Sequence, residues 1–249
     1  MNIVTIANYE ELLKLITERY YSKPRSRWIF RGHSNASYSL IPKVGRGTHP
    51  FNSRDGFEIT LFNNFKREAY PYVQRLPSSD WEWLTLAQHH GLPTRLLDWS
   101  YNPLVACYFS VASHPNSDGV VYALETPKRI DDEVILNTNP FKYEGIGKFK
   151  PNHVTERLII QEGLFTIQSN VESTIEKLLP KNWKLEKLLI SKESKQAIRY
   201  LLYRQGIHEA CFFPGLDGLA KHLNWKHLVT PKVLNQNNMH WCGDDDIDI

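Results

Sequence analysis

The stretch WEWLTLAQHHGLPTRLLDWSYNPLVACYFSVA, residues 81–112, places a dense group of polar residues between hydrophobic runs. Two adjacent histidines, a Gly-Leu-Pro-Thr turn, an arginine and an aspartate follow one another closely. Charged and imidazole side chains are costly to bury unless something pairs with them. The stretch therefore predicts a polar cluster that is set into a hydrophobic core and that has partners elsewhere in the chain.

The same stretch predicts the order helix, strand, helix. The first helix has Asp80 as its N-cap candidate and Gly91 as its C-terminal stop. Residues 94–100, TRLLDWS, have the composition of a strand, and residues 102–113 have that of a second helix with a proline in its first turn. The predicted strand therefore ends in a polar corner that leads directly into a helix.

Patterns on either side of this stretch extend the prediction. Hydrophobic periodicity and breaker residues predict helices at 7–22, 55–70, 192–206 and 216–228, and strands at 27–33, 119–125, 183–191 and 207–214. Residues 156–169 are expected to form one bent strand, or two strands joined by a turn at Gly163. Helices come early and short strands late, without regular βαβ alternation, which predicts an α+β fold with mixed or antiparallel sheets.

We expect a single domain over residues 1–243, with a helical part to about residue 90 and a sheet-rich part over 91–243. Residues 244–249 form an acidic tail. The chain has 249 residues, of which 41% are hydrophobic and 12% aromatic, so it can bury a substantial core. No run approaches the roughly 18 apolar residues of a membrane span, and the N-terminus lacks the basic start of a signal peptide.

The cysteine and charge content indicate the cellular compartment and the kind of partner. The three cysteines are far apart, odd in number and without CxxC spacing, which favours a cytoplasmic protein over a disulfide-bonded or zinc-binding one. The net charge is +3, and it is +7 for residues 1–243 because the tail carries four aspartates. This basic body favours a polyanion such as RNA or DNA as a partner, with an ordinary solvated surface as the alternative.

Common catalytic templates are absent from the sequence. It contains no Walker loop, GxGxxG, GxSxG or HExxH motif. His89 and His90 are adjacent on a predicted helix and point about 100° apart, so we expect no metal site there. Cys107 lies in the apolar run LVACYF and is expected in the core.

Three short segments together predict a functional site. Arg31 lies in the predicted strand WIFRGH, where its charge needs an anion or a carboxylate, and Gly32 lets a ligand approach the backbone closely. The corner at residues 98–100 ends another strand, and Glu209 starts the late run EACFF. A structural ion pair of Arg31 with Asp98 or Glu209 is the alternative explanation.

Four segments resemble the FRG domain, a family of bacterial and phage proteins named for a Phe-Arg-Gly motif. They are FRG at 30–32, AQHHGLPTRLLDWSYNPLVACYFSVA at 87–112, RLIIQEGLFTIQ at 157–168 and GIHEACFFPGLDGLAKHL at 206–223. The segment QHHGLPTRLLDW is the most specific of these. The family name alone implies no particular chemistry.

A looser similarity to ADP-ribosyltransferases does imply a chemistry. Those enzymes carry an arginine on a first strand, a Ser-Thr-Ser-like strand that leads into a helix, and a glutamate on a later strand. Arg31, the corner at 98–100 and Glu209 occur in that order. The similarity implies a split sheet, NAD as the substrate, Arg31 on the NAD phosphates or ribose, and Glu209 on the positive transition state. Glu162 is the rival for the catalytic carboxylate.

The residues expected to contact NAD come from the same segments, with Trp99 and Tyr101 stacking on nicotinamide. They are Arg31, Gly32, His90, Asp98, Trp99, Ser100 and Tyr101. Arg95 either lines this cleft or braces the corner by pairing with Asp98. The chain departs from the transferase pattern at the corner, which is Asp-Trp-Ser. It also departs at Ile207, where arginine-modifying enzymes carry Glu or Gln, so another protein side chain or a nucleic-acid base is the expected acceptor.

These observations lead to one hypothesis and two alternatives. The hypothesis is a cytoplasmic effector of the toxin or phage-defence type that transfers ADP-ribose from NAD to a macromolecule, or hydrolyses NAD. A toxin would imply a neutralising antitoxin. The first alternative is a nucleic-acid-binding or nuclease module without NAD chemistry. The second is a non-enzymatic interaction domain in which Arg31, Asp98 and Glu209 form one buried network.

Overall fold

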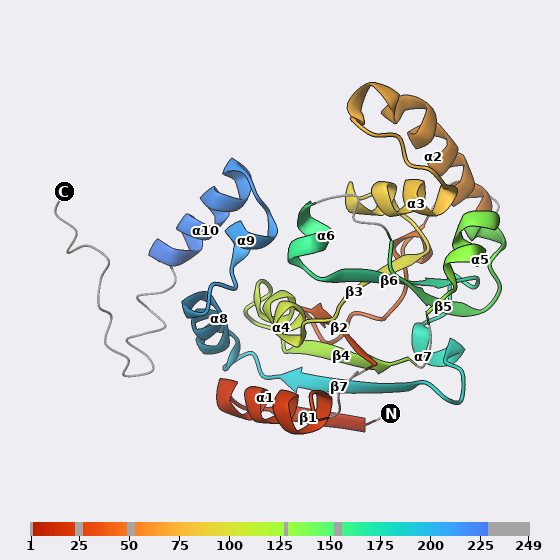
Figure 1. Ribbon diagram of the computed structural model, residues 1–249. Coiled ribbons are helices and arrows are strands. Elements are labelled where there is room, and N and C mark those ends of the chain that lie inside the picture. The colour runs from red at the N-terminus through yellow and green to blue at the C-terminus, as the bar shows by residue number, and fades with distance from the viewer. Residues whose placement is uncertain (1, 23–26, 49–52, 127–128, 152–155, 229–249) are drawn as a thin grey trace.

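A computed structural model describes residues 2–22, 27–48, 53–126, 129–151 and 156–228 (Figure 1). Within these residues seven strands form one sheet in the order β1-β7-β4-β2-β3-β6-β5. The strands are β1 Asn2–Ile6, β2 Trp28–His33, β3 Leu96–Ser100, β4 Gly119–Glu125, β5 Ile146–Phe149, β6 Gly163–Gln168 and β7 Lys184–Ile190. β1 pairs with β7 in parallel and the other neighbours are antiparallel, so the predicted α+β class with a mixed sheet is confirmed.

The helices surround this sheet (Figure 1). They are α1 Tyr9–Leu15, α2 Arg54–Ala69, α3 Asp80–His89, α4 Pro103–Val111, α5 Asp132–Asn137, α6 Glu156–Ile160, α7 Ile175–Leu178, α8 Lys195–Arg204, α9 Glu209–Phe212 and α10 Leu216–Leu228. None of the helices in the described residues is both long and apolar enough to cross a bilayer. The acidic tail lies outside the described residues.

Local signals in the opening stretch set the boundaries of α3 and α4. Gly91 adopts a φ of +87° just after α3, as a C-terminal stop requires. The side chain of Asn102 accepts a hydrogen bond from the Leu104 amide and caps α4. The N-cap of α3 is Ser79, whose hydroxyl accepts from the Glu82 amide, so the prediction of Asp80 was wrong by one residue.

Two strands were not predicted, and two predicted strands are wrong. The unpredicted strands are β1 and β5, and β1 lies with the predicted β2 in the part to residue 90 that was expected to be mainly helical. The predicted strand at 156–169 begins as α6 and turns into β6 at Glu162, which has a φ of +47°. The predicted strand at 207–214 is interrupted by α9, because Phe212 packs on the rings of Tyr108 and Phe109 in α4 instead of joining the sheet.

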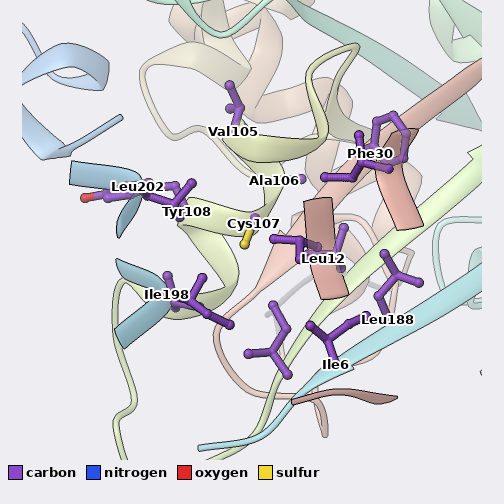
Figure 2. Packing of buried hydrophobic residues seen from close by; sticks show 14 of the residues in the cluster. Ile6, Leu12, Phe30, Val105, Ala106, Cys107, Tyr108, Leu188, Ile198 and Leu202 are labelled. Atoms are coloured by element: carbon purple, nitrogen blue, oxygen red, sulfur yellow. The ribbon is translucent and has the colours of Figure 1, made fainter. Parts of the chain in front are cut away.

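α4 lies against one face of the sheet and carries the centre of the largest core cluster (Figure 2). Cys107 is fully buried there, as expected, among side chains from α1, β2 and α8. The closest approach is at Gly32 in β2, where an added Cβ would lie 1.9 Å from the carbonyl oxygen of Ala106. Gly32 therefore serves the packing of α4 on β2. It also lines the cleft described below, and its expected contact with a ligand stays a prediction.

The contact between β2 and β3 is unlike the others in the sheet. The two strands share one residue pair, Phe30 with Ser100, whereas β2 pairs with β4 over six positions and β3 pairs with β6 over five. Beyond that pair β2 and β3 diverge. An opening therefore lies in the middle of the sheet; a split of the ADP-ribosyltransferase kind stays a prediction.

Candidate functional site

A cleft of about 500 Å³ lies where β2 and β3 diverge. Its walls come from β2, β3, β6, the end of α3, one side of α4, and the loop after β2. The lining residues include Arg31, His33, Ser34, Tyr38, Gln88, His89, Asp98, Phe109, Ser113, Leu158, Gln161 and Phe165. This volume is in the range of about 300–1,000 Å³ that is typical of small-molecule sites.

Arg31 supplies the cation of this cleft. Its Nη1 donates to the backbone oxygen of Asp98 at 2.7 Å and approaches the Asp98 Oδ2 at 3.3 Å. Its Nε donates to His33 Nε2 at 3.0 Å. Nη2 has no hydrogen-bond partner among the described residues. The guanidinium is thus fixed on one side and keeps free donors on the other.

His33 holds the guanidinium without neutralising it. Its ring is buried, and its Nδ1 lies 3.3 Å from the backbone oxygen of Tyr38. Burial, followed by the charge of Arg31, lowers the pKa of His33 to about 3, so the imidazole is neutral at pH 7. The Nδ1–H therefore donates to Tyr38, which leaves Nε2 to accept from Arg31.

Asp98 supplies the carboxylate, and the polar cluster of the opening stretch positions it. Asp98 Oδ2 accepts from Gln88 Nε2 at 2.8 Å, and Gln88 Oε1 accepts from the Thr94 hydroxyl at 2.5 Å. Asp98 is about half exposed, with 52% of its side chain accessible. Its Oδ1 has no hydrogen bond among the residues that the structure describes. The cleft thus combines a held cation with a partly free carboxylate.

Two residues of the predicted corner line the cleft, but their side chains are hydrogen-bonded to other parts of the protein. Trp99 is 3% exposed, and its Nε1 donates to the Thr166 hydroxyl at 2.9 Å, so its ring offers no open face for stacking. The Ser100 hydroxyl donates to the Gln161 backbone oxygen at 2.6 Å and accepts from the Asn102 amide. These bonds fix the turn from β3 into α4.

Other predicted site residues lie outside the cleft lining. The Glu209 carboxylate accepts a hydrogen bond from Tyr108 on α4, and no pair with Arg31 forms. Glu162 is exposed, and its backbone oxygen accepts from the Tyr101 amide. The ring of Tyr101 lies 5.9 Å from Lys150 Nζ. At the end of α3 the cleft is lined by His89 and not by the exposed His90.

Arg95 serves a different part of the core. Its Nε donates to Glu58 Oε2 at 2.9 Å and its Nη2 to Asp55 Oδ1 at 2.7 Å, so the predicted pair with Asp98 is wrong. Arg95 is 2% exposed and Glu58 is fully buried. Burial raises the pKa of Glu58, and the charge of Arg95 opposes that shift. Sequence reasoning missed Glu58 because its partner is 37 residues away.

A second polar group at the rim of the cleft was also missed. The rim cluster consists of Ser34, Tyr38, Ser113 and His114. His114 Nδ1 lies 2.9 Å from the Ser34 hydroxyl and 3.0 Å from that of Ser113, and its Nε2 lies 3.0 Å from the Tyr38 hydroxyl. Beneath it the ammonium of Lys195 donates to the backbone oxygens of Ser34, Ser113, His114 and Ser117. These residues come from three distant segments, which are the loop after β2, the segment after α4 and the start of α8, and they carry no recognisable spacing.

Part of the chain that forms this cleft matches a known protein family. Residues 26–119 match the family model of the FRG domain. This segment is an FRG domain. It contains β2, α2, α3, β3 and α4, and with them Arg31, His33, Gln88 and Asp98. The match is shorter than the predicted extent of 1–243, and the resembling segments at 157–168 and 206–223 lie outside it. No curated protein and no solved structure matches the chain.

Among the described residues, no three His, Cys, Asp or Glu side chains converge in a way that could hold a metal ion. The chemical groups that the FRG cleft presents are a guanidinium with free donors, one carboxylate and a neutral imidazole.

Proposed function

We propose that the FRG cleft binds NAD and that the protein breaks the bond between nicotinamide and ribose, passing ADP-ribose to a macromolecule or to water. The observation that supports this is the Arg31 guanidinium, which is fixed by His33 and Asp98 yet keeps its Nη2 donors free inside the cleft. Arginine presents donors in a fork that matches phosphate oxygens. Arg31 would hold the pyrophosphate of NAD.

Asp98 is the carboxylate that we assign to the reaction. When nicotinamide leaves with the electron pair of the broken bond, positive charge develops on the ribose carbon. A carboxylate that is already positioned in the cleft stabilises that charge. Gln88 and Arg31 both hold Asp98 Oδ2, which leaves Oδ1 for the ribose. The acceptor oxygen or nitrogen then attacks the ribose carbon and gives up its proton.

Nicotinamide release from NAD by the purified chain tests the activity. It should be measured with the protein alone and with added RNA, DNA or cell lysate. We expect release by the wild type, loss of at least tenfold in Asp98→Asn, and little change in Glu209→Gln. The opposite pattern in these two variants would return the catalytic role to Glu209. No release by folded protein under any condition overturns the proposed chemistry.

Calorimetric titration with NAD and with ADP-ribose tests binding separately. Arg31→Ala should weaken binding at least tenfold. Arg31→Lys retains the charge but lacks the fork, so it should recover only part of the affinity. Arg204→Ala is the control, because that arginine is exposed at the end of α8 and does not line the cleft. Equal binding by the wild type and Arg31→Ala would contradict the assignment.

A further inference from the structure

A group of basic residues lies at the β5 edge of the sheet. Lys148 on β5 is paired with Thr166 on β6, and the strands β6 and β3 separate β5 from Arg31 on β2. Lys148 does not line the cleft. A ligand bound at Lys148 therefore occupies a different place from a ligand bound at Arg31 in the cleft.

Three further cations surround Lys148. Arg129 is placed there because the amide of the next residue, Ile130, donates to the Lys148 backbone oxygen at 2.7 Å. Burial, followed by the charges of Arg27 and Arg129, lowers the pKa of Lys148 to about 8. Lys150 lies two residues along the same strand direction, with its Nζ 5.9 Å from the Tyr101 ring. We call Arg27, Arg129, Lys148, Lys150 and Tyr101 the basic patch.

The charge of Lys148 is not compensated within the described residues. The residue is nearly buried, at 7% exposure, and no hydrogen bond or ion pair joins its Nζ to another described residue. The nearest ion pair of the patch joins Arg129 to Asp132 at 2.9 Å, and both of these side chains are more than half exposed. An ammonium on a nearly buried side chain beside other cations is unfavourable unless an anion is bound.

We propose that the basic patch binds a phosphate group, carried by a nucleic-acid strand or by a free nucleotide, with Tyr101 beside it as a ring on which a base stacks. Lys148 would donate from below while Arg27, Arg129 and Lys150 contact the phosphate from its exposed sides. Cations that follow a backbone and an aromatic ring for a base are the usual elements of single-strand binding. Phosphate binding here is independent of NAD chemistry in the cleft.

Fluorescence anisotropy with labelled single-stranded RNA and DNA, in competition with inorganic phosphate and AMP, tests the proposal on the full chain. Displacement of the labelled strands by phosphate and by AMP, at concentrations similar to those of the strands, would identify a free nucleotide as the ligand. Binding of the strands that AMP displaces poorly would identify nucleic acid. No binding of either kind at low salt overturns the proposal.

Lys148→Met gives the sharpest variant, because two measurements should move in opposite directions. Affinity should fall at least tenfold. The slope of log affinity against log salt should become less negative by about one, which corresponds to the loss of one phosphate contact. The melting temperature of the free protein should rise, because an uncompensated buried charge is removed while its volume is kept. Lower stability together with unchanged binding would show a purely structural lysine and contradict the proposal.

Three further variants complete the design. Arg129→Ala, at an exposed position, should also weaken binding and carries little risk of misfolding. Lys181→Met removes the same charge from an exposed position outside the patch and should leave affinity unchanged. Arg31→Ala should leave it unchanged too, because Arg31 lies in the cleft. Equal losses in Lys181→Met would mean unspecific charge attraction and would overturn the assignment.

Discussion

Arg31 Nε donates to Nε2 of His33, two residues further along the same strand, at 3.0 Å. Residues two apart on a strand face the same side, so the short motif Arg-Gly-His suffices to place a cation beside a neutral base. The glycine between them is the point where α4 approaches β2 most closely. Three consecutive residues of the FRG domain thus provide the cation of the cleft, the packing contact and the orienting imidazole.

His33 should make the stability of the protein depend on pH in the acid range. The folded pKa is about 3, below the ordinary value of 6.5, because the ring is buried beside Arg31. As pH falls through this window the unfolded chain takes up a proton that the folded chain rejects, so stability is lost, by at most about 1.4 kcal/mol per pH unit. Denaturant unfolding of the wild type and His33→Gln should show a shallower loss in the variant. His90→Gln, at an exposed position, is the control and should follow the wild type.

Gly32→Ala should destabilise the fold severely. The new methyl group would lie 1.9 Å from the Ala106 oxygen and 2.8 Å from the Ser110 amide nitrogen, both of which are backbone atoms that cannot move aside alone. We expect a loss of about 3 kcal/mol or more by thermal unfolding. Gly47→Ala meets no atom within 4 Å and changes only the backbone preference at a φ of +70°, so it should cost about 1 kcal/mol. Equal effects of the two variants would contradict the close packing of α4 on β2.

Removing one partner of the buried pair of Glu58 and Arg95 should destabilise the fold strongly, whereas replacing both partners with apolar residues should not. Arg95→Met leaves a buried carboxylate without its cation and should lose about 3–5 kcal/mol. The double variant Glu58→Leu with Arg95→Met should recover most of that loss. Asp55→Asn should cost at most about 1 kcal/mol, since Asp55 is 61% exposed. A double variant as unstable as Arg95→Met would disprove the pairing.

Lys195→Met should destabilise the rim of the cleft. The variant removes the donor that serves four backbone oxygens at 2.7–3.1 Å and leaves these part-buried acceptors without it. We expect a loss of about 2 kcal/mol or more, with faster amide exchange in residues 112–118. Lys192→Met is the control, because that side chain is 53% exposed. Unchanged exchange in this loop would show that Lys195 does not organise the rim cluster.

Sequence reasoning recovered what is encoded over short distances. The helix ends at Gly91 and Asn102 follow from capping rules, and the positions of β2, β3, β4 and β7 follow from their hydrophobic runs. It also brought Arg31 and Asp98 together, because an arginine in a buried strand needs a partner. The FRG motif itself was recognisable, and the family match over residues 26–119 agrees with it.

The remaining features depend on contacts between distant segments. EACFF has the composition of a strand, but its Phe212 packs on α4, and only the folded chain shows that. Arg95 and Asp98 are close in sequence and point to different partners, because Glu58 of α2 lies on the side that Arg95 faces. The position of Glu209 beside Tyr108 rather than Arg31 likewise follows from the packing of α9.

The single residue pair between β2 and β3 divides the sheet mechanically. On one side lie β1, β7, β4 and β2, and on the other β3, β6 and β5. Within the described part of the chain, the backbone ladder joins the two groups only at Phe30 and Ser100. Two such groups open as separate cooperative units when little holds them together. The Arg31 side chain is the main polar link next to that pair, so a ligand bound to Arg31 and Asp98 would couple the unfolding of both groups.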